Sequence, residues 1–173
     1  MILAPLPDEF APAFAGYVAR VATLSDPLQE LPTQRARVRS RLAPLSDEQA
    51  AFRYAPGKWS IKEMVGHLSD TERVFAYRLL RLGRGDATPL ASFDENDYAR
   101  AAQAHERRFE DLLDEWLIVR DATTALARGL PESSWTNRGT STSGSPMSVR
   151  ALLFIILGHT EHHLNVLAEK YRV

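Results

Sequence analysis

The chain has 173 residues, of which 45% are hydrophobic and 25% charged; this composition is typical of a globular protein, and we expect one domain over residues 1–173. Its 21 basic residues are balanced by 22 acidic ones, so a nucleic-acid partner is not expected, because such binding requires an excess of basic charge. The chain has five histidines but no cysteine, which excludes disulfides, thiolate metal sites and a cysteine nucleophile.

Helices are expected almost throughout, because no segment shows the sustained alternation of apolar and polar residues that marks a strand. The first ten residues contain prolines and acids and do not predict a secretory signal. Helical stretches are expected over 8–23 and 27–42, with kinks or breaks around Pro27 and Pro32. A capping box that begins at Ser46 predicts a short helix there.

Three longer helices are expected over 60–82, 94–128 and 148–171, with long loops at 84–93 and 130–147. The longest wholly apolar run, seven residues in the last helix, is too short to cross a membrane, so we expect no membrane partner and a cytoplasmic location. Together with the proline-containing helix before them, these helices predict an all-α fold. The expected architecture is a four-helix bundle whose long connections allow a topology other than simple up-down-up-down.

Three histidines lie on the inward faces of two predicted helices. His67 shares a helical face with Thr71 and Phe75, and taken alone it is more often a core histidine than a metal ligand. His159 follows the most apolar stretch of the chain, and His163 lies one turn further on, about 40° around the helix. Such a pair can hold one metal ion. Three imidazoles without a fourth protein ligand leave a coordination position open, which is typical of a catalytic metal site.

Nearby polar residues have less specific interpretations. His162 falls about 60° to the other side of His159, so His163 is preferred as the ligand, and His162 is expected to be a partly exposed bystander. Glu161 points about 160° away from His159 and is expected to face solvent. His105 lies in a charge-rich stretch and is expected on a solvated helix face.

Other residues could belong to a site or only to the framework. Asp70 could orient a ligand imidazole, although a surface pair with Arg73 is the commoner arrangement. Arg138 could meet an anionic substrate group, although an exposed loop arginine is the simpler interpretation. Three large side chains could line a pocket mouth or only close the core: Leu90, Phe93 and Trp135. The motifs of zinc proteases, di-iron bundles, serine hydrolases and nucleotide-binding loops are absent from the sequence.

Three stretches of the chain resemble the DinB/YfiT-like superfamily of four-helix metalloproteins. They are 52–73, with its Trp-Ser-Ile-Lys-Glu cap, 93–99, and 147–166, with Gly-His-Thr-Glu-His-His. The resemblance implies a compact helical bundle, often a homodimer, with one divalent metal ion. The implied ligands are His67, His159 and His163, none of which is missing here. We expect zinc or nickel, with manganese or iron as alternatives.

The resemblance implies several activities. Some members of the superfamily are thiol-dependent transferases or isomerases that use bacillithiol, mycothiol or glutathione, and others are metal-dependent hydrolases. Our leading hypothesis is a bacterial, metal-dependent thiol S-transferase that acts on a small molecule entering near the two long loops. Because the chain has no cysteine, the thiol would come from a low-molecular-weight cosubstrate. The alternatives are a hydrolase that uses metal-bound water and a non-catalytic, stress-related metal-binding protein.

Overall fold

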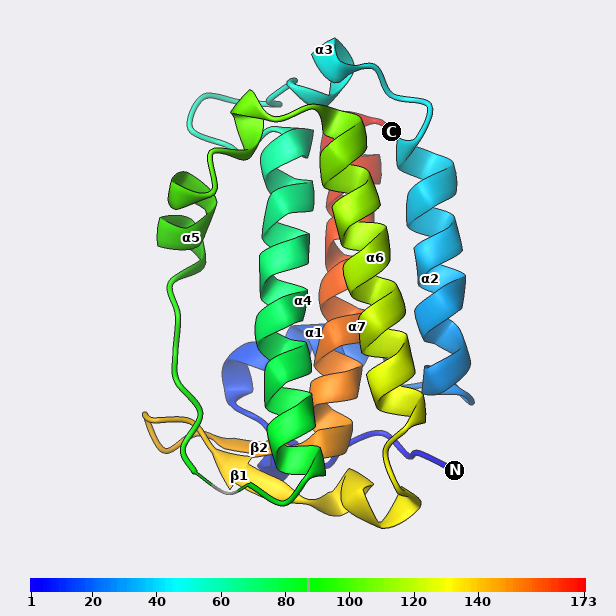
Figure 1. Ribbon diagram of the computed structural model, residues 1–173, viewed down its shortest axis with the longest axis vertical. Helices are drawn as coiled ribbons and strands as arrows, with labels where there is room; N and C mark the ends of the chain where they lie inside the picture. The colour runs from blue at the N-terminus through cyan, green and yellow to red at the C-terminus, as the bar shows by residue number, and fades with distance from the viewer. Residues whose placement is uncertain (87) are drawn as a thin grey trace.

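The computed structural model describes residues 1–86 and 88–173, so residue 87 of the expected loop 84–93 lies outside the described residues. Four long helices pack side by side in this structure (Figure 1). They are α2 (Pro27–Leu42), α4 (Ile61–Gly83), α6 (Phe109–Arg128) and α7 (Val149–Val166). Helices α6 and α7 each pack against both α2 and α4. The predicted all-α four-helix bundle is therefore confirmed.

The order of the helices in the bundle differs from a simple up-down-up-down arrangement. Helix α4 follows α2 through the short helix α3 (Asp47–Ala50) and runs in the opposite direction (Figure 1). The chain then returns along the outside of the bundle through α5 (Glu95–Ala101), so that α6 runs parallel to α4. Helix α7 runs antiparallel to both. The long connections thus produce the different topology that they allowed.

Local signals explain where the main helices begin. The Ser60 hydroxyl accepts a hydrogen bond from the Glu63 amide, and the Glu63 carboxylate accepts one from the Ser60 amide, which closes the predicted capping box of α4. Ser148 caps α7 through a single hydrogen bond, which its hydroxyl accepts from the Ala151 amide. Helix α2 begins at Pro27, as predicted, and continues without a break through Pro32.

Two predicted helices are wrong. The expected helix over 94–128 is divided into α5, a 3-10 turn (Ala104–Glu106) and α6, because Gln103 adopts a left-handed conformation with φ of 47°. In the expected stretch 8–23, only α1 (Ala15–Val21) is α-helical. Two 3-10 turns, Pro7–Glu9 and Pro12–Phe14, precede it, and Pro12 lacks the amide that a continuous helix over 8–23 would require there. At the C-terminal end, α7 is followed by a π-helical turn, Leu167–Tyr171.

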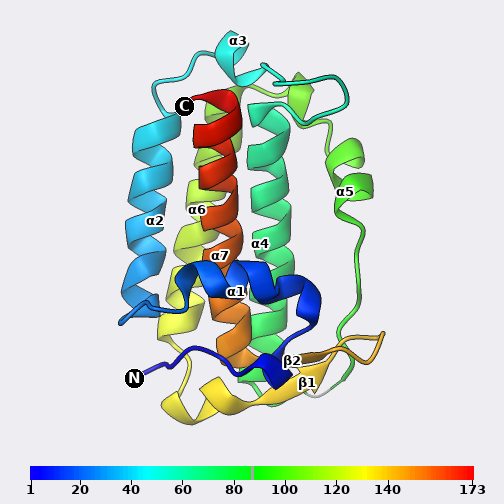
Figure 2. The same ribbon diagram turned by 180° about the vertical axis from the view of Figure 1, so that it is seen from behind.

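The expected absence of strands is also wrong. The loop before α7 contains a two-stranded antiparallel sheet of β1 (Arg138–Thr140) and β2 (Pro146–Ser148), in which Gly139 is paired with Met147. Met147 also bridges Phe10, and Ser141 bridges Leu90. The hairpin therefore joins the N-terminal segment and the loop after α4 at one end of the bundle. Helix α1 crosses α7 above it (Figure 2).

The bundle core has two apolar halves. One half surrounds the first part of α7, where all seven residues of 151–157 are buried. The other half surrounds the start of α4 and the end of α7 and includes Met64, Trp116 and Leu164. Within the described part of the chain, no helix has the length and apolar character needed to cross a membrane. The polar side chains between the two halves are described next.

Candidate metal centre

A layer of buried polar side chains crosses the bundle between the two apolar halves. Arg120 of α6 donates two hydrogen bonds to the carboxylate of Glu72 on α4, at 2.6 and 2.9 Å. It also donates to Gln34 of α2 at 3.0 Å and to Thr160 of α7 at 2.7 Å. Arg120 thus connects all four helices. Because Thr160 directly follows His159, this network also fixes the part of α7 that carries the histidines.

The three histidines predicted as ligands lie next to this layer, since His159 directly precedes Thr160. His67 comes from α4, and His159 and His163 come from successive turns of α7. The Nε2 atom of His159 is 3.0 Å from Nε2 of His67 and 3.1 Å from Nε2 of His163. All three side chains are buried, and one possible ligand atom from each lies within 4.8 Å of the others. The structure therefore brings together three residues separated by up to 96 positions in sequence, from His67 to His163.

The spacing and charge of these imidazoles fit a divalent metal. Zinc–nitrogen bonds of about 2.0–2.1 Å at tetrahedral angles would place two nitrogens about 3.3 Å apart. Burial lowers the pKa of His67 to about 4. Burial, followed by the neighbouring histidines, holds the pKa values of His159 and His163 well below 6.5. At neutral pH the three rings are therefore uncharged, and an unprotonated nitrogen of each can donate its lone pair.

Surrounding side chains hold the rings in place. The Thr71 hydroxyl lies 3.3 Å from Nδ1 of His67 and can accept a hydrogen bond from Nδ1–H, in the tautomer that leaves Nε2 free to act as a ligand. The Trp59 ring lies 4.7 Å from the His67 ring, and the Tyr17 ring packs edge-on against His159 at 5.3 Å. Among the described residues, Nδ1 of His163 is buried without a hydrogen-bond partner.

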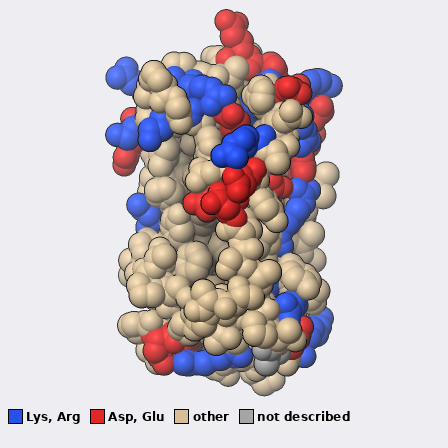
Figure 3. All heavy atoms as spheres, turned by 90° about the vertical axis from the view of Figure 1, so that its left-hand side faces the viewer, with Lys and Arg blue, Asp and Glu red and all other residues tan. Residues whose placement is uncertain are grey.

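A cavity of about 550 Å³ reaches the three histidines. Its aromatic walls come from the N-terminal segment, the start and middle of α4 and the loop before α5, and consist of Phe14, Tyr17, Trp59, Phe75 and Phe93. Its polar residues include Arg78, Glu95, His162 and three serines of the β1–β2 turn, Ser141, Ser143 and Ser145. Figure 3 shows the side of the molecule where α5 lies. Charged side chains gather near its two ends and in one acidic group, and much of the remaining surface is uncharged. The cavity is large enough for a small organic molecule beside the histidines.

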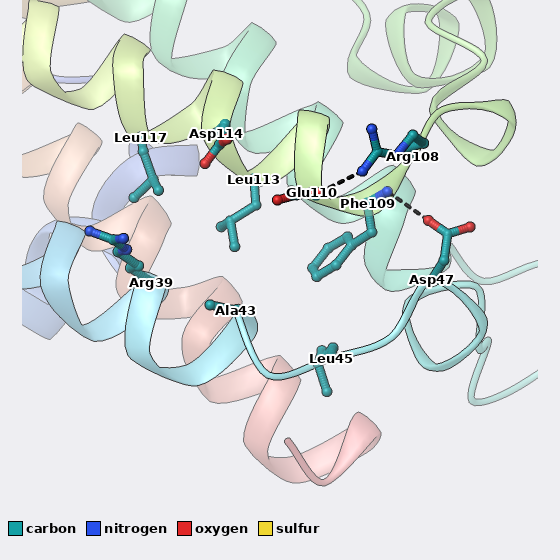
Figure 4. A pocket seen from close by; sticks show the side chains of 10 residues that line it. All are labelled: Arg39, Ala43, Leu45, Asp47, Arg108, Phe109, Glu110, Leu113, Asp114 and Leu117. Atoms are coloured by element: carbon teal, nitrogen blue, oxygen red, sulfur yellow. Dashed lines mark hydrogen bonds and ion pairs between the residues drawn. The ribbon is translucent and has the colours of Figure 1, made fainter.

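A second cavity, of about 480 Å³, lies between the end of α2 and the start of α6 (Figure 4). Its lining has no histidine, and several of its charged groups already have partners. Arg108 pairs with Glu110 at 2.6 Å, and Asp47 accepts from the Phe109 amide and from Lys62. This cavity therefore lacks the chemistry of the first.

Two polar residues between His159 and His163 contact other parts of the chain. His162 is partly exposed and lies outside the three converging nitrogens, as expected, and it also lines the cavity. Burial, followed by the charge of Arg20, lowers the pKa of its imidazole. Glu161 does not simply face solvent: it pairs with Arg37 at 2.9 Å and accepts a hydrogen bond from Gln34. His162 contacts Tyr17 of α1, and Glu161 contacts α2, and the sequence of α7 alone does not determine where α1 and α2 lie.

The framework interpretations of other residues are confirmed. His105 is exposed, and Asp70 pairs with Arg73 at 3.5 Å. Arg138 pairs with Asp8 and Glu9 instead of lining the cavity. Of the three large side chains, Leu90 and Trp135 are buried in the core, and Phe93 lines the cavity.

Some cavity residues carried no signal in the sequence. Tyr17 and the serines of the β1–β2 turn belong to other segments than the histidines, and only the crossing of α1 and the hairpin pairing bring them there. Arg78 alone could have been found, because it lies eleven residues after His67 and therefore on the same face of α4.

Comparisons with known proteins agree with this architecture. Residues 30–167 match the sequence model of the DinB superfamily. A Bacillus licheniformis protein, named as a metal-dependent hydrolase, is 29% identical over 134 residues, which are 73% of this chain and 73% of that protein.

Two solved structures share the fold. YfiT from Bacillus subtilis, described as a metal-dependent hydrolase with an unusual four-helix bundle topology, has a TM-score of 0.76 and 18% identity over 84% of each chain. A mycothiol-dependent maleylpyruvate isomerase has a TM-score of 0.66 and 12% identity, over 79% of this chain and 57% of the isomerase. Since the family match covers most of the sequence and the bundle topology agrees with it, the chain belongs to the DinB superfamily.

Proposed function

We propose that this chain is a divalent-metal enzyme that activates a low-molecular-weight thiol for transfer to a small electrophilic substrate. His67, His159 and His163 hold the metal, which is zinc or nickel in this proposal. The observation that carries the proposal is the convergence of three buried, uncharged imidazoles at a cavity that a small molecule can occupy. Residues 1–173 act as one unit, because the N-terminal segment, α4, α7 and both long connections line that cavity.

A divalent metal in this position would lower the pKa of a thiol or of a water molecule, and so supply a nucleophile at neutral pH. The protein contributes the three nitrogen ligands and an aromatic enclosure that limits the access of water. The half-buried His162, whose ring lies 5.0 Å from the His163 ring, is placed to accept or return a proton at the cavity wall.

The lining of the cavity favours a thiol over water. Among the described residues, the only carboxylate that lines it is Glu95, which is exposed. Hydrolysis would therefore have to use His162 as its base, whereas a thiol that coordinates a metal loses its proton without needing a dedicated base. The five aromatic walls also provide apolar surface for an organic cosubstrate. The name of the mycothiol-dependent isomerase that shares the fold points in the same direction.

Hydrolysis is the second candidate, because the names of the Bacillus licheniformis relative and of YfiT describe metal-dependent hydrolases. The same three histidines would serve, with water in place of the thiol. The two activities differ in their need for thiol: the rate of transfer depends on added thiol, whereas hydrolysis proceeds without it.

A thiol panel with a chromogenic electrophile, such as a halodinitrobenzene, tests the proposal on zinc- or nickel-loaded protein. We expect turnover that rises with thiol concentration and is lost in His67→Ala, while the matched control His105→Ala keeps the parent rate. Ester hydrolysis independent of thiol would replace the proposal with the hydrolase. A large fall in melting temperature on metal removal, without turnover of either kind, would identify a structural metal.

A further inference from the structure

Three cationic side chains are buried in the described part of the chain: Lys62, Arg78 and Arg120. Lys62 pairs with Asp47 at 2.5 Å, and Arg120 pairs with Glu72 at 2.6 Å. Arg78 differs from both, because no carboxylate among the described residues lies within ion-pair distance of its guanidinium. Its side chain is nevertheless only 7% exposed.

The Arg78 guanidinium has one hydrogen bond to the described residues, from Nη2 to the carbonyl oxygen of Ala91 at 2.5 Å. An arginine has five N–H donors in a planar fork, so most of them remain available. Burying a charge without an opposite charge is unfavourable, and cation–π contact offsets only part of that cost. The guanidinium carbon lies 5.4 Å from the ring centre of Phe75 and 5.7 Å from that of Phe93. These two rings hold the fork in a fixed orientation.

Arg78 belongs to the cavity of the candidate metal centre. It lines this cavity together with Phe75 and Phe93. Eleven residues separate it from His67, which is three helical turns plus about 20°, so both side chains are on one face of α4. The Phe75 ring contacts both groups, since its centre lies 5.4 Å from the Arg78 guanidinium carbon and 6.4 Å from the ring centre of His159, so the guanidinium is on the order of 10 Å from the His159 imidazole.

We propose that Arg78 binds a carboxylate of the substrate or cosubstrate whose reacting end lies at the three histidines. This inference rests on the function proposed above and specifies the substrate class: a small molecule with a carboxylate about five to six bonds from its reacting atom. A planar carboxylate matches the fork between the two rings. Hydroxyls of the β1–β2 turn line the same cavity and can add neutral donors. The lining carboxylate Glu95 is exposed and makes no ion pair with Arg78 within the described chain.

Calorimetric titration of the full zinc-loaded chain tests the inference with two matched pairs of probes. The first pair is 6-mercaptohexanoate and 6-mercapto-1-hexanol, and the second pair is hexanoate and 1-hexanol. We expect each carboxylate to bind the parent protein about 10-fold more tightly than its alcohol, as a charge-assisted bidentate contact would produce. Arg78→Met should reduce this ratio to about one and leave the affinity for the alcohols unchanged, whereas Arg78→Lys should retain part of it.

Arg81→Met is the matched control. Arg81 lies on the same helix and also anchors the loop after α4, through Asp86 and the carbonyl of Thr88, but it does not line this cavity. This variant should keep the parent ratio. The inference would be overturned if carboxylates and alcohols bound the parent protein equally. It would also be overturned if Arg78→Met weakened the binding of both probes of a pair alike, and Arg78 would then only anchor the loop. Failure of the proposed function gives a different result, namely that the two thiol probes bind no more tightly than hexanoate and 1-hexanol.

Discussion

Helix α1 crosses α7 at Gly158, and this crossing predicts the effect of adding one methyl group. A Cβ atom at Gly158 would lie 3.0 Å from Cα of Tyr17, 2.5 Å from its carbonyl carbon and nearer still to its carbonyl oxygen. These are backbone atoms, so no rotation of a side chain relieves the overlap, and α1 must move by about 1 Å to restore van der Waals separation. The movement would displace Tyr17, whose ring packs against His159.

The cost of Gly158→Ala follows from two opposing effects. Overpacking destabilises by about 1–3 kcal/mol, and the upper part of that range, about 2–3 kcal/mol, applies here because the overlap is with backbone atoms. Alanine in a helix interior is more favourable than glycine by about 1 kcal/mol, which offsets part of the loss. We expect a net loss of about 1–2 kcal/mol, which for a chain of this size lowers the melting temperature by about 2–8 °C.

Thermal unfolding followed by circular dichroism measures this change, and Gly16→Ala provides the control. Gly16 lies in α1, and a Cβ atom there would meet nothing within 4 Å. This variant should be at least as stable as the parent, because only the helix propensity changes. A Gly158→Ala protein that melts at or above the parent temperature would refute the close crossing of α1 and α7.

Two further predictions concern buried ion pairs. A hydrogen bond from Arg150 lowers the pKa of Glu9 from 4.5 to about 2, so the stability from this carboxylate is present above pH 4.5 and is lost as the pH falls toward 2. Glu9→Gln should therefore lower the free energy of unfolding by about 3 kcal/mol at pH 7 and flatten the fall in melting temperature between pH 4.5 and 2. The control Asp8→Asn, at an exposed pair, should cost less than about 1 kcal/mol. Equal effects of the two substitutions would contradict the difference in burial. Glu72→Gln should lower the free energy of unfolding, measured in urea, by about 3–5 kcal/mol, because it leaves Arg120 buried without its carboxylate. Replacing both residues by apolar ones should cost much less. A double variant as unstable as the single one would show that the pair itself supplies the stability.

The main helices were predictable because their signals are local. The capping boxes at Ser46 and Ser60 and the prolines and glycines at helix ends act within a few residues, and the structure confirms them. The approach of His159 and His163 also follows from their spacing of four residues on one helix. Their approach to His67 follows from the bundle architecture, once α4 and α7 are neighbours.

The errors arise where distant contacts decide the conformation. The sequence from 94 to 128 continues a helical pattern, but Gln103 adopts a left-handed conformation and the chain turns there. The three-residue strands β1 and β2 are too short to show alternation, and bridges to Phe10 and Leu90 hold their hairpin in place. In the same way, the burial of Arg78 without a carboxylate depends on the loop around Phe93, which its own helix does not predict.

The metal content of the untagged chain tests most directly whether His67, His159 and His163 form one metal site. The protein would be dialysed against zinc or nickel, freed of excess ion and measured by mass spectrometry together with single alanine variants. We predict one metal ion per chain in the parent and in His162→Ala, and loss of the ion in each of the three ligand variants. A parent chain that stays metal-free, or a loss confined to His162→Ala, would contradict the three-histidine site.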